Sequence, residues 1–68
     1  MNKLENRKIQ REIVEQLKNT DECALGSLVR KLNYSYNQIL TNVMELIQKG
    51  DIQKLEGHNG YFSLEKDY

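Results

Sequence analysis

The sequence is short of several residue types, and each shortage excludes a class of protein. It holds one cysteine, one histidine and no proline or tryptophan among its 68 residues. The single thiol of Cys23 allows no internal disulfide and supplies too few ligands for a cysteine-based metal site. We expect Cys23 to be a partly buried apolar side chain, with an intermolecular disulfide or a redox switch as the alternative. His58 has no second histidine or cysteine at ligand spacing, so we expect neither a metal nor a cofactor.

Long apolar runs and an excess of either charge are also missing. No segment approaches the ~20 apolar residues of a membrane span, and residues 1–11 are too polar for a signal peptide, so the sequence predicts a cytoplasmic protein. No phosphate-binding glycine loop and no pairing of nucleophile and base is recognisable, so we expect no enzyme. Ten basic residues balance ten acidic ones, whereas proteins that bind nucleic acid mainly through its phosphates are usually more basic.

What the sequence does contain is the pattern of one small globular domain over residues 1–68. A content of 38% hydrophobic and 29% charged residues excludes intrinsic disorder. Three apolar periods of helical spacing predict helices near residues 3–18, 24–32 and 36–49. The apolar residues of these periods are Ile9, Ile13, Val14 and Leu17, then Leu25, Leu28, Val29 and Leu32, then Ile39, Leu40, Val43, Leu46 and Ile47.

The ends of these helices carry their own signals. The second helix has two plausible starts: Asp21 as its cap, or a short extended run through Cys23 with the helix beginning near Ala24. Ser35 followed by Gln38 has the spacing of a capping box for the third helix. Gly50 directly after Lys49 is typical of a helix C-terminus.

The last part of the chain predicts a β-hairpin with strands near 51–56 and 61–64. Asn59-Gly60 lies between two short extended runs, and this dipeptide is a strong hairpin signal because both residues tolerate positive φ. The fold class is therefore α+β, mostly α. We expect one core containing Ile13, Leu17, Leu28, Leu32, Ile39, Val43, Leu46 and Phe62, with Tyr34 packed against it.

The segment from Leu28 to Ser35 (LVRKLNYS), followed by Ile39, Val43 and Leu46, resembles the helix-turn-helix of bacterial transcriptional regulators. The continuation 48–52 (QKGDI) and 60–64 (GYFSL) is similar to the wing that follows in that family, so the resemblance covers residues 9–64. It implies a winged helix-turn-helix with the third helix in the DNA major groove and the hairpin on the backbone. The sequence departs from the family pattern at Val29 (usually Ala), at Asn33 (usually Gly, although Asn tolerates the left-handed conformation) and at Thr41 (often basic).

The resemblance implies which side chains meet DNA. Residues that project outward from the third helix are Asn37, Gln38, Thr41, Glu45 and Gln48, and those expected to contact bases are Tyr36, Asn37, Gln38 and Thr41. Tyr36 has two alternatives, a phosphate contact or packing on the second helix. Candidate phosphate contacts are Arg30, Lys31, Ser35, Lys54 and His58; Arg7, Lys8 and Arg11 belong to the first helix, which usually lies behind the DNA-binding surface. A solvated polar surface is the alternative for all of them.

Two functions compete at this point. The first is sequence-specific binding of double-stranded DNA by a small transcriptional regulator, with a homodimer formed through the first helix and the terminal residues. The alternative is a winged-helix protein–protein interaction module without DNA binding. Zero net charge and the lack of Lys or Arg in residues 36–48 favour the alternative.

Overall fold

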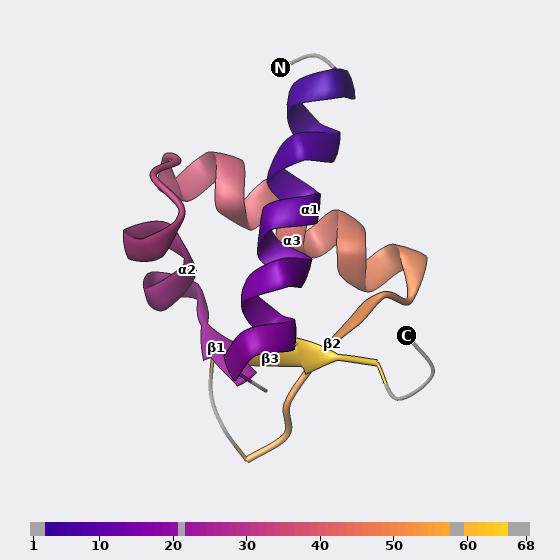
Figure 1. Ribbon diagram of the computed structural model, residues 1–68. Coiled ribbons are helices and arrows are strands. Elements are labelled where there is room, and N and C mark those ends of the chain that lie inside the picture. The colour runs from indigo at the N-terminus through magenta and orange to yellow at the C-terminus, as the bar shows by residue number, and fades with distance from the viewer. Residues whose placement is uncertain (1–2, 21, 58–59, 66–68) are drawn as a thin grey trace.

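The computed structural model describes residues 3–20, 22–57 and 60–65 and consists of three helices and a three-stranded antiparallel sheet. In chain order the elements are α1 (Lys3–Thr20), β1 (Glu22–Ala24), α2 (Leu25–Lys31), α3 (Tyr36–Lys49), β2 (Ile52–Lys54) and β3 (Tyr61–Leu64). Helix α1 crosses in front of α3, α2 lies to one side, and the sheet lies across the C-terminal end of α1 (Figure 1). The predicted helices and their order are confirmed, and the α+β class with them.

Helix α1 forms because a run without glycine or proline places an apolar residue on the same side at almost every turn. Ile9, Ile13 and Leu17 are at most 2% exposed and face α3 and the sheet. The helix continues two residues beyond the predicted end at 18. In its last turn the Thr20 hydroxyl donates a hydrogen bond of 2.9 Å to the Gln16 carbonyl oxygen, one turn earlier in the same helix.

Helix α3 has the bounds that its caps predict. The Ser35 Oγ accepts the Gln38 backbone N–H at 3.2 Å, and the Gln38 Oε1 accepts the Ser35 backbone N–H at 3.0 Å, so the capping box is confirmed. Gly50 ends the helix in the left-handed conformation, with φ of 85°. Between α2 and α3, Asn33 adopts a φ of 44°, as expected for the residue that stands in place of the usual glycine of the turn.

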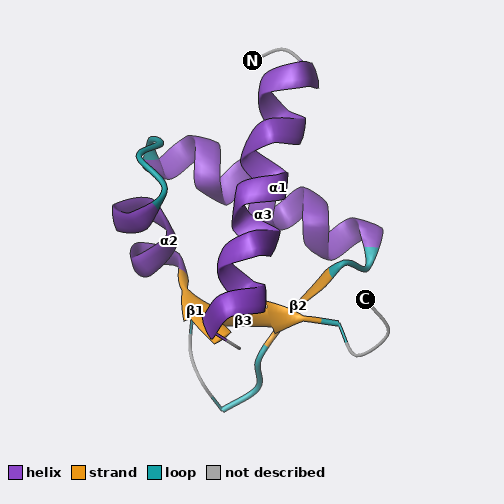
Figure 2. Cartoon of the chain, in the orientation of Figure 1, coloured by secondary structure: helices purple, strands orange, loops and turns teal. Residues whose placement is uncertain are grey.

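The sheet is larger than the predicted hairpin. Strands β2 and β3 pair antiparallel as expected, although β2 ends at Lys54 rather than 56, and the Asn59 of the predicted turn lies outside the described residues. On its other edge β3 pairs with β1, with Cys23 opposite Phe62, so the order is β1-β3-β2 (Figure 2). The extended alternative for the run through Cys23 is thus the one adopted, and α2 begins at Leu25.

All the predicted core residues belong to one buried cluster, which Ile9, Val14, Cys23 and Ile52 complete. Cys23 is 4% exposed, which matches the expectation of a buried apolar side chain. Tyr34 is partly buried against the same cluster, as predicted. Because β2 follows directly after α3 and packs on it, and β3 pairs with β2, the arrangement is compatible with a winged helix-turn-helix.

Candidate nucleic-acid interface

The N-terminal end of α3 is held in place by contacts with α1. Gln38 uses both ends of its side-chain amide: its Oε1 accepts the Ser35 N–H, and its Nε2 donates to Glu5 Oε1 at 3.1 Å. Its side chain therefore fixes the start of α3 and joins it to α1. Gln38, one of the four expected base contacts, thus uses one acceptor and one donor of its amide within the protein.

Asn37 and Thr41 are in a different situation from Gln38. Both side chains are exposed on the outer side of α3, and neither makes a hydrogen bond with the described part of the chain. Gln48 is exposed on the same side two turns further on. These amide and hydroxyl groups can each donate and accept hydrogen bonds, which is the chemistry needed to bind base edges or a polar partner surface.

An apolar side chain lies within this outer face that the sequence interpretation did not include. Met44 is 52% exposed and lies one turn after Thr41 and one turn before Gln48. Tyr36 is 55% exposed at the start of the helix, so it does not pack fully on α2, and Leu40 between them is half-buried. Its helical spacing from Thr41 and Gln48 could have predicted from the sequence that Met44 lies on the outer face of α3.

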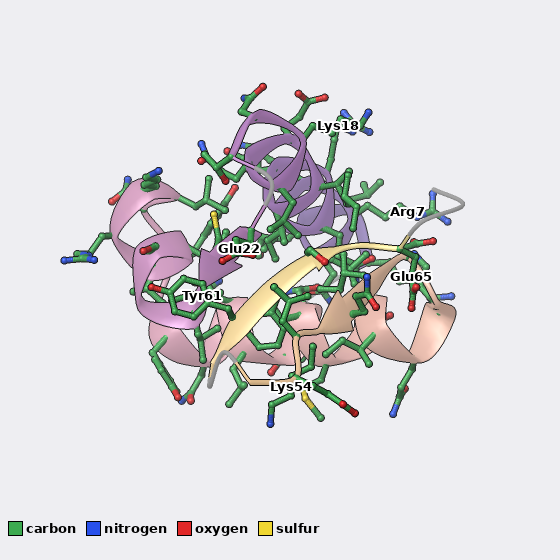
Figure 3. All side chains as sticks on the ribbon, turned by 90° about the horizontal axis from the view of Figure 1, so that it is seen from below. Arg7, Lys18, Glu22, Lys54, Tyr61 and Glu65 are labelled. Carbon is green, nitrogen blue, oxygen red and sulfur yellow. The ribbon has the colours of Figure 1, made fainter. Side chains whose placement is uncertain are left out.

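Exposed cations flank the outer face at two places. Arg30 and Lys31 end α2, immediately before the turn into α3, and Lys54 ends β2. None of the three forms an ion pair with a described residue, so their charges are available to an anion. Figure 3 shows Lys54 on the α3 side of the sheet, opposite to α1. Ser35 is exposed at the start of α3, and His58 lies outside the described residues.

Two arginines of α1 border a hollow rather than the outer face of α3. Arg7 and Arg11 line a hollow between α1 and the C-terminal part of α3, with a volume of about 410 Å³. Arg7 and Lys18 point away from Lys54 in Figure 3. Lys8 is exposed on α1 and is not among the lining residues of the hollow.

A buried polar network joins α1 to the inner side of α3. Asn42 is fully buried, and its side-chain oxygen accepts a hydrogen bond of 2.9 Å from the buried Gln10. The Asn42 Nδ2 donates to the Gln38 carbonyl oxygen at 2.8 Å, and Lys49 Nζ donates to Gln10 Oε1 at 3.2 Å. No buried side-chain polar atom of the described residues lacks a partner, so the network is complete within them. It fixes which side of α3 faces outward.

One phenol near the same end of α3 has a perturbed acidity. The Tyr34 hydroxyl donates a hydrogen bond to Glu12 Oε2 on α1. This hydrogen bond, together with partial burial and the negative charges of Glu12 and Glu5, raises the pKa of Tyr34 above its usual 10.0. The contact ties the turn before α3 to α1.

Comparisons with known proteins return no match, neither among family models nor among curated proteins or solved structures. Any function assigned to the chain therefore rests on its own surface chemistry. No helix in the described ranges combines the length and the apolar character needed to cross a membrane. Within those same ranges, no three His, Cys, Asp or Glu side chains gather where they could hold a metal ion.

Proposed function

We propose that the chain binds double-stranded DNA as a small transcriptional regulator, in the manner of a winged helix-turn-helix. The observation that carries the proposal is the outer face of α3, where Asn37 and Thr41 are exposed and have no partner among the described residues. Duplex DNA is bound with this face in the major groove, because a helix fits that groove and its base edges offer donors and acceptors.

Base contacts in this proposal come from Asn37, Thr41 and Tyr36, with Gln38 in a supporting position. Asn37 pairs with an adenine through its amide, and Thr41 and Tyr36 reach a base edge or a thymine methyl group. Gln38 holds the N-terminus of α3 through the capping box and Glu5, which keeps Asn37 correctly placed.

Phosphate contacts in this proposal come from the flanking cations. Arg30 and Lys31 lie at one end of the outer face, and Lys54 lies on the hairpin. Ser35 can donate its hydroxyl hydrogen to a phosphate while its oxygen accepts the Gln38 N–H. His58, which lies outside the described residues, is also assigned to the DNA backbone. So few cations predict a shallow salt dependence, corresponding to about 3–5 phosphates per domain.

The proposal includes a homodimer in the cytoplasm. One small domain covers only about 600–1,000 Å² on DNA, and a twofold pair doubles that area. Helix α1 faces away from the DNA in this arrangement, and Leu4 at its start is 75% exposed. We assign the dimer contact to α1, and sedimentation of the free protein over a range of concentrations tests it. A monomer at all concentrations, both free and with DNA, contradicts the dimer.

A protein-interaction module is the second candidate, and one observation favours it. Tyr36 and Met44 are exposed large hydrophobic side chains on the same helix, with half-buried Leu40 between them. Apolar side chains of this kind form the centre of many protein interfaces. Under this alternative the outer face of α3 binds a partner protein and no DNA.

The experiment that separates the two candidates is enrichment of a random duplex library, followed by salt titrations on the enriched and a random sequence. We expect Asn37→Ala to weaken binding to the enriched sequence by about 1–3 kcal/mol and to change random binding little. Lys54→Ala should weaken both and make the salt slope shallower by about one unit. If the parent binds no duplex even at ~50 mM salt, where phosphate contacts are strong, the protein-interaction module takes the place of DNA binding.

A further inference from the structure

The positive charge of α1 is concentrated on one side of the helix. Five of the ten basic residues of the chain belong to α1, and four of them, Lys3, Arg7, Arg11 and Lys18, fall within one sector at helical spacing. Lys49 at the end of α3 faces the same sector across a hollow. The zero net charge of the chain therefore conceals an excess of basic over acidic side chains along this edge.

This edge borders a groove between α1 and α3. The hollow of about 410 Å³ adjoins a smaller one of about 230 Å³, and Arg7, Gln10 and Lys49 line both. Val14 and Leu46 lie at the bottom of the larger hollow and are almost fully buried. We call the two hollows together the α1–α3 groove.

Two of the basic side chains that line the groove have no ion-pair partner among the described residues. Arg7 and Arg11 lie one helical turn apart and form no ion pair or hydrogen bond with the described residues. Lys18 and Lys49 are already paired, with Glu15 at 4.0 Å and Asp51 at 3.7 Å. The groove therefore offers two adjacent guanidinium groups, each able to hold a carboxylate through two parallel hydrogen bonds.

A duplex bound on the outer face of α3 does not account for these arginines. Lys18 lies on the opposite side of the molecule from Lys54, which flanks that face, and Arg7 lies at a lateral edge, away from Lys54 (Figure 3). A second anionic partner is needed to use the charge of the α1–α3 groove.

We propose that the α1–α3 groove binds an acidic segment of a partner protein, with carboxylates of the segment on Arg7 and Arg11. Carboxylates of the groove itself favour a peptide over a nucleic acid, because Glu15, Glu45 and Asp51 lie among its cations. A nucleic acid carries a negatively charged phosphate at every nucleotide, and some of these phosphates would be repelled by the carboxylates of the groove. A peptide places neutral residues there and carboxylates only where the arginines are.

The proposal is tested with a fluorescein-labelled helical peptide that carries glutamate at every fourth position. Its control is the same peptide with glutamine in place of glutamate. Binding is measured by fluorescence anisotropy, and the site is located by amide chemical shifts of the full chain. The variants are Arg7→Glu and Arg11→Glu, and the matched control is Lys8→Glu, which changes the net charge equally on the same helix but outside the groove.

We expect the glutamate peptide to bind, the glutamine peptide not to bind, and shifts to gather around Arg7, Arg11 and Lys49. Each arginine variant should weaken binding about tenfold, and Lys8→Glu should change it by less than about threefold. Thermal melts of all three variants check that α1 is intact. Failure of the peptide to bind, or equal losses in all three variants, overturns the proposal.

Two further outcomes identify a different occupant of the groove. If a random duplex shifts the groove amides and competes with the peptide, the groove is a nucleic-acid site and the acidic segment is wrong. If the free chain is a dimer and Arg7→Glu makes it a monomer, a second copy occupies the groove and the proposal again fails. Because the duplex experiments on Asn37 and Lys54 probe the other side of the molecule, failure here leaves the proposed DNA binding intact.

Discussion

The two sides of α3 use the same residue type in opposite ways. On the inner side Asn42 is fully buried and its amide is bonded to Gln10 and to the backbone. On the outer side Asn37 is exposed and has no hydrogen bond with the described residues. The difference shows that polar content alone does not identify a binding surface, because a polar group is available to a partner only when the fold leaves it unbonded.

The largest expected effect is on stability, when an apolar residue is truncated on the inner or on the outer side of α3. Leu46→Ala on the inner side should lower the free energy of unfolding by about 2–5 kcal/mol, because Leu46 is buried and its loss leaves a cavity. In a domain this small that is a large part of the total stability. Met44→Ala, on the same helix but exposed, should change stability by less than about 0.5 kcal/mol. Urea unfolding measures both, and equal losses contradict the assignment of the two sides.

The second comparison is between the two asparagines themselves. Asn42→Ala should cost about 1–3 kcal/mol, because it leaves Gln10 buried without its partner, whereas Asn37→Ala should be nearly neutral for stability. A double variant, Gln10→Leu with Asn42→Leu, removes both partners and should recover part of that loss. Thermal melts of the three variants check this, and a double variant less stable than Asn42→Ala shows that the network has no apolar substitute.

The third comparison sets the cations of the two sides against each other. Lys31→Glu next to the outer face should weaken binding to a random duplex about tenfold at ~50 mM salt, because it reverses a phosphate contact. Arg7→Glu in the α1–α3 groove changes the net charge equally but should weaken DNA binding only by about twofold. Anisotropy titrations at low and moderate salt distinguish them, and equal losses would mean that DNA binding has no preferred side.

The smallest effect is expected from two tyrosines on either side of Ser35. Tyr34→Phe removes the phenol bonded to Glu12, and Tyr36→Phe removes an exposed one. The raised pKa of Tyr34 means that its contribution to stability is complete below pH 10 and disappears as the pH rises through its folded-state value. An absorbance titration of the parent minus that of Tyr34→Phe should therefore show a phenol ionising above pH 10. A difference curve centred at or below pH 10 contradicts the bond to Glu12.

Much of the fold was predictable because its signals are local. The bounds of α3 follow from Ser35, Gln38 and Gly50, and the pairing of β2 with β3 follows from short extended runs around a glycine-rich turn. The extended run through Cys23 was only one of two alternatives for this segment. The three residues of β1 are too few to show the alternation of polar and apolar residues that indicates a strand. It forms because β3 has a second edge and Phe62 lies opposite Cys23, which is a long-range contact.

The candidate interface was predictable only in part. Helical spacing placed Asn37 and Thr41 outward, and the predicted capping box already joined the Gln38 side chain to Ser35, but no local signal indicated its second bond, to Glu5. The α1–α3 groove was not predictable at all, because Arg7 and Lys49 are far apart in the sequence and meet only when α1 crosses α3. Asn42 has a spacing from Ile39 and Leu46 that places it on the inner side of α3. Its burial was nevertheless not predicted, because asparagine is a polar residue.

The central place of β3 in the sheet has a consequence for the order in which the domain assembles during synthesis. β1 and β2 do not pair with each other, and each finds its partner in β3, the last element of the described chain. A growing chain on the ribosome therefore carries all three helices before it can close any part of the sheet. Until Leu64 has emerged, neither edge of β1 or β2 is paired, and Cys23 and Ile52 lack Phe62 and Leu64 opposite them.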